Sequence, residues 1–205
     1  RNEGTLTARD GGYISLMGQQ VQNTGVIAAR MGKVVLAGGQ AVTLDVVGDG
    51  LLSAVVDSAS VKALVDNAGL LTADGGQIFL SAKSAGGLLD TVVNQSGVVQ
   101  ANSLSGANGE IRLDGGSRGV VQVSGNLLAQ GAQAGTQGGT VKVLGDKVGL
   151  FGAATVDVSG QNGGGKVLLG GDFHGQGADT NASQTIIASG ASIHADALQS
   201  GAGGQ

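Results

Sequence analysis

The stretch at residues 165–169, GKVLL, decides the fold, because variants of it recur along the whole chain. The others are GYISL (12–16), GKVVL (32–36), GQIFL (76–80), GEIRL (109–113) and GTVKV (139–143). In every variant the third and fifth residues are apolar, whereas the second and fourth are mixed. Residues two apart lie on one face of a β-strand, so this pattern predicts strands with one buried face.

A second set of strand-like stretches alternates with the first. It comprises GTLTA (4–8), GVIAA (25–29), GLLTA (69–73), GVVQA (97–101), GNLLA (125–129), TVDVSG (155–160) and SIHADA (192–197). In most of them a large inward residue is followed by a small one, as in Leu127 and Ala129, which suits a narrow core. Short strands that recur in this way predict a solenoid whose coils stack on one another.

The spacing of the repeat gives an expected number of coils. The first set begins at positions 12, 32, 76, 109, 139 and 165, so the interval from 32 to 76 is the longest. That interval contains two more apolar stretches, 41–47 and 51–56, which we expect to supply a further pair of strands. The sequence therefore predicts one all-β domain over residues 1–205, a parallel β-solenoid of about eight coils.

Glycine, proline and asparagine fit this architecture. Glycine provides 41 of the 205 residues, and proline is absent. Corners between short strands favour positive φ, which glycine accepts at low cost, and proline has no N–H for a parallel ladder. Asn2, Asn23 and Asn67 each stand two residues before a strand glycine. This spacing predicts asparagines that stack at a turn and bond to the backbone.

The composition also excludes several classes of protein. Apolar residues make up 41% of the chain, which argues against disorder. The net charge of −4, with scattered basic residues, disfavours a nucleic-acid partner. No apolar run approaches the roughly 20 residues of a membrane-spanning helix, and the lack of cysteine excludes disulfides and thiolate metal sites. Because the chain begins at Arg1 with no signal peptide, we expect a mature product or a piece of a longer protein.

The stretch from Gly160 to Lys166 has a spacing similar to that of a phosphate-binding loop. Gly160, Gly165 and Lys166 have most of the spacing of the motif G-x-x-x-x-G-K-[ST]. However, Val167 stands where the motif needs a hydroxyl, and the residues that follow favour a strand instead of a helix. We therefore predict a glycine corner followed by an outward-facing lysine, with no nucleotide or other cofactor bound.

The ordered series of segments resembles a known family. DGGYISLMGQQVQNTGVIAARMGKVVLAGGQAVTLD (10–45), GDGLLSAVV (48–56), NAGLLTADGGQIFLSAK (67–83), GGTVKVLGDKVGLF (138–151) and GGKVLLGGDFHGQG (164–177) are similar to the filamentous-haemagglutinin-like exoproteins of two-partner secretion. The resemblance implies a right-handed parallel β-helix, exported by a dedicated outer-membrane transporter and secreted or held at the bacterial cell surface. It also implies use as an adhesin, biofilm-matrix protein or toxin stalk.

The resemblance bears on domain organisation as well. The family's secretion domain carries Asn-Pro-Asn motifs near its start, and this chain has no proline. We therefore expect residues 1–66 to hold at most the last coils of that domain, or the transition from it, and the rest to be a single β-helix segment. A host-cell surface or a matrix polysaccharide is the partner that such a segment implies.

Two outward columns contain the candidate functional residues. The first runs through Ser15, Val35, Phe79, Arg112, Lys142 and Leu168, and we predict its last four members to be a surface contact strip unless a neighbouring loop covers them. The second runs through Thr7, Ala28, Thr72, Gln100, Leu128, Asp157 and His194. It places Asp157 beside His194, which favours a cross-strand ion pair over a catalytic site that would need more groups.

The remaining candidates have ordinary structural explanations. Asp45, Asp49 and Asp57 could bind calcium, but their spacing matches no calcium motif and favours turn aspartates. His174 is expected to be a loop residue instead of a metal ligand. Asn94 and Asn181 begin N-x-[ST] sequons, so glycosylation stays open. We therefore predict no catalytic, metal or cofactor site.

These observations favour a secreted, structural and adhesive rod segment without catalysis. Two alternatives remain open. A carbohydrate-active β-helix enzyme, of the polysaccharide lyase or hydrolase type, would need a dense cluster of acidic and basic residues on one face. A passive stalk of a contact-dependent toxin would have the same repeat and no binding surface of its own.

Overall fold

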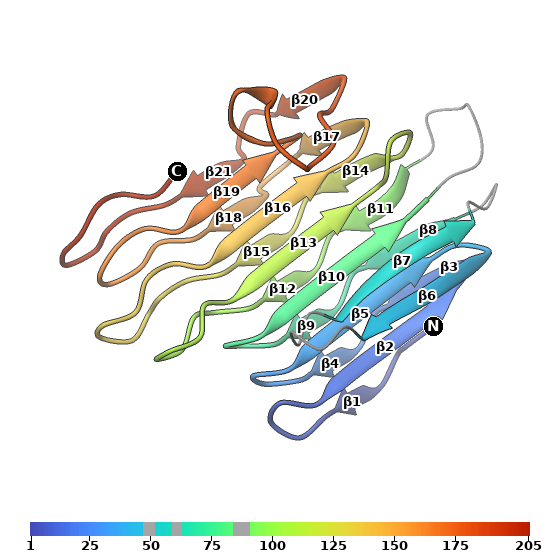
Figure 1. Ribbon diagram of the computed structural model, residues 1–205, viewed down its shortest axis with the longest axis horizontal. Helices are drawn as coiled ribbons and strands as arrows, with labels where there is room; N and C mark the ends of the chain where they lie inside the picture. Colours follow the sequence, from blue (N-terminus) through green and yellow to red (C-terminus); the bar gives the residue numbers. More distant parts are fainter. Residues whose placement is uncertain (47–51, 59–62, 84–90) are drawn as a thin grey trace.

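The computed structural model describes residues 1–46, 52–58, 63–83 and 91–205. Within these residues the chain forms three parallel β-sheets and one antiparallel hairpin, and the only helical element is the short 3-10 turn η1 (Phe173–Gly175). The strands follow one another along the molecule from the N-terminal end to the C-terminal end (Figure 1). The predicted all-β parallel β-helix is confirmed.

Each parallel sheet gathers one strand from every coil. Sheet 1 is β1 (Thr5–Thr7), β4 (Val26–Ala28), β9 (Leu70–Thr72), β12 (Val98–Gln100), β15 (Asn126–Leu128), β18 (Thr155–Asp157) and β21 (Ser192–His194). Sheet 2 is β2 (Tyr13–Gly18), β5 (Lys33–Gly38), β10 (Gln77–Ala82), β13 (Glu110–Asp114), β16 (Thr140–Leu144) and β19 (Lys166–Leu169). Sheet 3 is β3 (Gln20–Asn23), β8 (Leu64–Asn67), β11 (Thr91–Gln95), β14 (Val120–Val123), β17 (Lys147–Leu150) and β20 (Gln184–Ile187).

The expected eight coils are not found. The described strands make six coils of three strands each, and β21 starts another. The two stretches expected to supply an extra coil instead form β6 (Ala41–Val46) and β7 (Leu52–Ser58), which pair antiparallel with each other. β5 therefore pairs directly with β10, across the long interval of the repeat. Alternating apolar residues suit a hairpin strand as well as a coil strand, so the pattern could not separate the two.

The predicted inward residues form one continuous core. Ile78, Ile111 and Val141 stack in successive coils of sheet 2 and are fully buried. On sheet 1 the large and small pair Leu127 and Ala129 is also fully buried, as the narrow-core prediction requires. Their counterparts in the first and last coils are only partly buried, because those coils have a neighbour on one side only. Each coil therefore depends on its neighbours for burial.

The glycines before the strands are required because there is no room for a Cβ atom, whereas we expected positive φ to be the reason. A Cβ on Gly97 would lie 2.1 Å from the carbonyl oxygen of Gly69, and one on Gly165 would lie 2.0 Å from that of Gly139. Neither glycine has positive φ. Positive φ is found at other corner glycines, such as Gly11. The repeat therefore preserves glycine where one coil's backbone touches the next.

The predicted asparagine stack is present and buried. The side-chain amide of Asn2 donates to the side-chain oxygen of Asn23, and that of Asn23 donates to Asn67, both at 2.7 Å. Each of the two amides also donates to the carbonyl oxygen of the glycine two residues later, at 3.3 Å. The stack therefore joins successive coils and at the same time fixes the turn from sheet 3 to sheet 1.

Gln95 continues the asparagine stack, and we did not predict its part. Its side-chain oxygen accepts a hydrogen bond of 2.7 Å from the amide of Asn67. A signal existed, because Gln95 also stands two residues before a strand glycine, Gly97. Its own amide nitrogen is buried without a hydrogen-bond partner, since the next residue in register is Val123. We call Asn2, Asn23, Asn67 and Gln95 the amide ladder.

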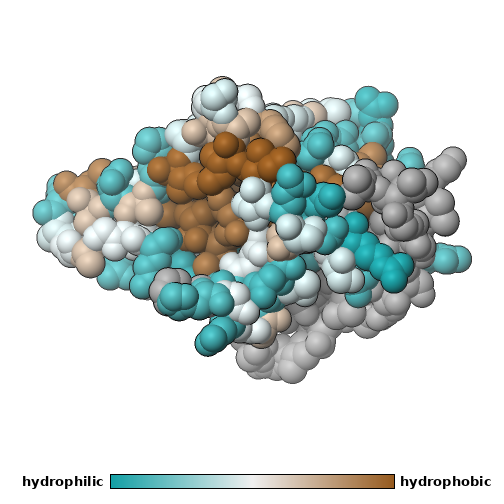
Figure 2. Space-filling view, turned by 90° about the horizontal axis from the view of Figure 1, so that it is seen from above, coloured by the Kyte–Doolittle hydropathy of each residue, from teal (hydrophilic) through white to brown (hydrophobic). Residues whose placement is uncertain are grey.

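The C-terminal end of the β-helix exposes apolar side chains. Ile186 and Ile187 on β20, Ile193 on β21 and Leu198 beyond it are between 38% and 57% exposed. The view from above shows an apolar area on the molecule (Figure 2). No helix within the described ranges is long and apolar enough to cross a membrane.

Candidate functional site

The outward column of sheet 2 follows the predicted order. Successive pairs in register are Ser15 with Val35, Val35 with Phe79, Phe79 with Arg112, Arg112 with Lys142, and Lys142 with Leu168. The apolar members are nevertheless covered, since Val35 is fully buried and Phe79 and Leu168 are 9% and 8% exposed. The backbone of hairpin strand β7 lies against β5 and β10, at the Val35 and Phe79 end of the column.

The two basic members of the column hold an acidic residue from another coil. Asp179 lies in the segment between β19 and β20, which leaves the coil path near the C-terminal end (Figure 1). One of its carboxylate oxygens accepts a hydrogen bond from Arg112 at 2.8 Å, and the other accepts one from Lys142 at 2.7 Å. The Asp179 side chain is only 9% exposed. The segment is thus tied across β13 and β16, an arrangement we call the Asp179 clamp.

The charges of the clamp stabilise one another. Burial alone would raise the pKa of Asp179, but the hydrogen bonds and positive charges of Lys142 and Arg112 outweigh it, and the pKa is lowered. Burial would likewise lower the pKa of Arg112, but Asp114 at 3.0 Å and Asp179 hold it above its ordinary value. Asp179 and Arg112 therefore both stay ionised at neutral pH.

The clamp limits what the predicted contact strip can offer a partner. Phe79 and Leu168 have little exposed surface, and the cationic groups of Arg112 and Lys142 already bind Asp179. A partner that used this strip would have to displace the segment that carries Asp179. The role of the four residues in contacts with other molecules stays a prediction.

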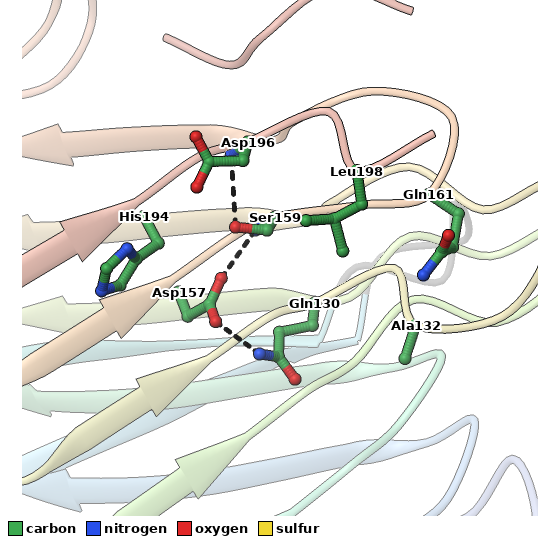
Figure 3. A pocket seen from close by; sticks show the side chains of 8 residues that line it. All are labelled: Gln130, Ala132, Asp157, Ser159, Gln161, His194, Asp196 and Leu198. Carbon is green, nitrogen blue, oxygen red and sulfur yellow. Dashed lines mark hydrogen bonds between the residues drawn. The ribbon is translucent and has the colours of Figure 1, made fainter. Parts of the chain in front are cut away.

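The outward column of sheet 1 also has the predicted register, with Asp157 beside His194. The described residues show no ion pair between these two side chains. The Asp157 carboxylate instead accepts hydrogen bonds from the side-chain amide of Gln130 and, at 2.8 Å, from the backbone N–H of Ser159 (Figure 3). Asp157 is thus held by its own coil and by the preceding one, and His194 lies next to it.

A polar pocket of about 340 Å³ opens over this part of sheet 1. Its lining comes from three successive coils and comprises Gln130, Ala132, Asp157, Ser159, Gln161, His194, Asp196 and Leu198 (Figure 3). Ser159 Oγ accepts a hydrogen bond of 3.2 Å from the backbone N–H of Asp196. Within the described part of the chain no hydrogen bond joins this hydroxyl to a histidine or a carboxylate, the contact by which a base activates a serine nucleophile.

The other candidate residues lie apart from this pocket. Lys166 begins β19, where it pairs with Thr140, and a strand instead of a helix starts at this lysine, so the context that a phosphate loop needs is missing. Asp45 and Asp57 lie on β6 and β7, and Asp49 is outside the described residues. His174 lies in η1 with a φ of 57°. The described residues contain no group of three acidic, histidine or cysteine side chains placed to hold a metal ion.

The two sequons differ in their surroundings. Asn94 lies on β11, and its side-chain amide donates a hydrogen bond of 2.8 Å to the carboxylate of Asp66. Asn181 is exposed in the segment that carries Asp179, and its amide donates to the carbonyl oxygen of Gly175 at 2.9 Å. Asn181 is therefore the more accessible acceptor, and modification of either residue stays open.

Comparison with known proteins finds similarity among solved structures. No protein-family model and no curated protein matches the chain. Among solved structures, the HMW1 secretion domain from Haemophilus influenzae matches with 30% sequence identity and a TM-score of 0.75. The match covers 92% of this chain and 47% of that one, so this chain spans about half the length of the solved relative. The resemblance to two-partner-secretion exoproteins is confirmed, and the chain has the β-helix of such a passenger.

Proposed function

We propose that this chain is a structural and adhesive rod segment of a bacterial exoprotein, exported by an outer-membrane transporter of two-partner secretion. The observation that supports the proposal is the likeness to a secretion domain over 92% of the chain, with three parallel sheets in one register. The proposed location is the cell surface or the extracellular medium. The proposed partners are the transporter during export and a host surface or matrix polysaccharide afterwards.

A non-catalytic role agrees with the chemistry of the pocket over sheet 1. Asp157 is bound to Gln130 and to the backbone of Ser159, which leaves it poorly placed to transfer protons. The hydroxyl of Ser159 accepts from a backbone N–H, and in the described structure no hydrogen bond joins it to a carboxylate or a histidine. A hydrolase or lyase needs a nucleophile, an acid or a base aimed at one point. The pocket therefore suits binding better than bond cleavage.

The position of the chain within the full exoprotein is also a proposal. The absence of proline favours residues 1–66 as the last coils of the secretion domain, or the transition from it. The likeness to a secretion domain extends beyond these residues to 92% of the chain. A β-helix continues from one domain to the next with the same coil geometry, so likeness of coils does not by itself locate the boundary.

Export and adhesion can be tested in the bacterium that makes the protein. An antibody against this segment should detect the protein in the medium or on intact cells, and deletion of the partner transporter should abolish that signal. Deletion of residues 1–205 from the exoprotein should reduce attachment to epithelial cells or to a polysaccharide-coated surface. Unchanged exposure without any transporter would contradict the export proposal, and unchanged attachment at equal surface amounts would leave a passive stalk. Release of reducing ends from polysaccharides by the purified protein would favour the enzyme alternative.

A further inference from the structure

The cationic pair of the Asp179 clamp lies between two insertions on the outer face of sheet 2. Arg112 and Lys142 are in register on β13 and β16. Strand β7 of the hairpin contacts β5 and β10 on one side of the pair, and residues 170–183 leave the coil from β19 on the other. Asp114 pairs with Arg112 at 3.0 Å, which leaves one net positive charge. Because like charges in register repel one another, the pair is stable only with a further anion beside it.

The anion beside this pair comes from outside the repeat. Elsewhere the same sheet joins polar side chains within a column, since the amide of Gln77 donates to Glu110, in register, at 2.9 Å. Arg112 and Lys142 instead bind the Asp179 carboxylate, one at each oxygen. The strands that flank the Asp179 segment keep their pairing with β16 and β17. The structure thus shows a carboxylate bound between two cations, and a removable segment supplies it.

The segment that carries Asp179 has a narrow base that contains glycines. The backbone N–H of Ala182 donates to the carbonyl oxygen of Gly170 at 2.7 Å and closes the base. Gly170 and Gly171 have φ values of 74° and 139°, and glycine accepts large changes of φ and ψ at low cost. Within the segment, the Asp172 carboxylate accepts from the backbone N–H of Asp179 at 3.2 Å. Rotation at the base would therefore withdraw Asp179 from both cations together.

We propose that Arg112 and Lys142 form a binding site for a carboxylate of an acidic polysaccharide, and that Asp179 is a built-in competitor for this site. The two cationic side chains are 28% and 25% exposed, so a ligand can reach them before the segment moves. A uronate carboxylate would then take the place of Asp179, with one oxygen on each cation. The inference rests on the proposed adhesive function and names the class of ligand for it.

The competitor gives the proposal a specific sign. Asp179 is tethered to the site, so it competes at a high effective concentration and keeps the affinity of the parent chain low. Asp179→Asn removes the competing charge and should strengthen the binding of a galacturonate hexamer by about tenfold or more. Addition of Lys142→Gln to this variant should abolish the gain, because one of the two cations is then lost.

The test is equilibrium binding to the purified 205-residue chain at about 0.15 M salt, where attraction between distant charges is screened. The control probe is the methyl ester of the same hexamer, which lacks the charge and should show no saturable binding. Asp10→Asn removes the same charge from an exposed ion pair and should leave binding unchanged. Equal gains by Asp10→Asn and Asp179→Asn, equal binding of acid and ester, or no gain for Asp179→Asn would overturn the proposal.

Displacement of the segment has a separate readout that keeps Asp179 in place. The chain has no cysteine, and Gln176 is exposed in the segment, so Gln176→Cys can carry a single spin label. Saturation with the galacturonate hexamer should increase the mobility of this label, and the ester should not. Saturable binding without a change in mobility would overturn the displacement. Failure of these experiments leaves the export and attachment experiments on whole cells unaffected, so the two failures are distinguishable.

Discussion

The side-chain amide of Asn23 donates a hydrogen bond to the side-chain oxygen of Asn67, 2.7 Å away in space and 44 residues later in the chain. Both side chains are fully buried. The hairpin of β6 and β7 lies between them in sequence, so this contact joins two coils directly across the insertion. These buried amide groups can pair only when the two coils stack in this register. The hydrogen bond therefore favours this register over shifted ones.

Truncation of the middle of the amide ladder should therefore be costly. Asn67→Ala leaves the amide of Asn23 with only its 3.3 Å bond to Gly25, and it leaves the buried side-chain oxygen of Gln95 without its donor. We expect the free energy of unfolding to fall by about 3 kcal/mol. Urea or thermal unfolding measures the change. Asn2 lies at the end of the ladder and makes one ladder bond, to Asn23, so Asn2→Ala should cost about half as much. Equal losses would contradict a ladder whose members depend on both neighbours.

The ladder can also be extended by one residue. Val123 is next in register after Gln95, whose amide nitrogen is buried without a partner. Val123→Asn offers that nitrogen an acceptor, and its own amide can reach the carbonyl of Gly125 as in the other coils. We expect the free energy of unfolding to stay within about 1 kcal/mol of the parent. The control Val148→Asn buries the same amide where no ladder residue precedes it, and should cost about 2 kcal/mol or more. A smaller loss of unfolding free energy for Val148→Asn than for Val123→Asn would contradict this prediction.

The glycines that precede the strands of sheet 1 include one with a close backbone contact and one without, so the two can be compared directly. Gly4 and Gly97 occupy equivalent positions in different coils, but a Cβ on Gly97 would lie 2.1 Å from a carbonyl oxygen, whereas one on Gly4 would meet nothing within 4 Å. Gly97→Ala should lower the free energy of unfolding by about 3 kcal/mol, because the coils must separate to admit the methyl group. Gly4→Ala should change it by less than about 0.5 kcal/mol. The comparison is made by unfolding the two variants under one condition; similar melting temperatures would show that space is not the constraint.

The Asp179 clamp should make the free energy of unfolding depend on pH in the acidic range. The pKa of Asp179 is lowered in the folded chain, so its contribution is complete above its unfolded pKa of about 3.9 and is lost as the pH falls through the lowered folded value. Asp179→Asn should cost about 2 kcal/mol at pH 7. The difference between parent and variant, measured by urea unfolding, should stay constant from about pH 7 to pH 5 and shrink below about pH 4.

The control for the clamp is an exposed ion pair. Asp10 pairs with Arg30 while its side chain is 62% exposed, so Asp10→Asn should change stability by less than about 0.5 kcal/mol at any pH. If Asp179→Asn behaves like Asp10→Asn, the segment that carries Asp179 is not held by its charges.

The parts of the fold that repeat could be predicted from sequence, and the insertions could not. Arg112 and Lys142 were assigned to one outward column because alternation and glycine spacing fix both face and register. Neither rule applies to Asp179, which lies in a segment without a repeat, so nothing in the sequence indicated that it would neutralise this pair. The same limit explains why the sequence predicted that Asp157 lies beside His194 but predicted no pocket there: these two residues lie on repeated strands, whereas Ser159 and Asp196 lie at corners.

The hairpin of β6 and β7 shows where this architecture accepts new sequence. It leaves the coil between sheet 2 and sheet 3, as does the segment that carries Asp179, and in both coils the flanking strands keep their pairing with the neighbouring coils. The corner from sheet 3 to sheet 1 is different, because only two residues separate Asn23 from Val26 and the amide ladder occupies it. The corner from sheet 3 to sheet 1 thus sets the geometry of the rod. The connection from sheet 2 to sheet 3 can change in length without affecting that geometry. A foreign peptide grafted in place of the hairpin would be displayed on the side of the rod, and the coils beneath would stay in alignment.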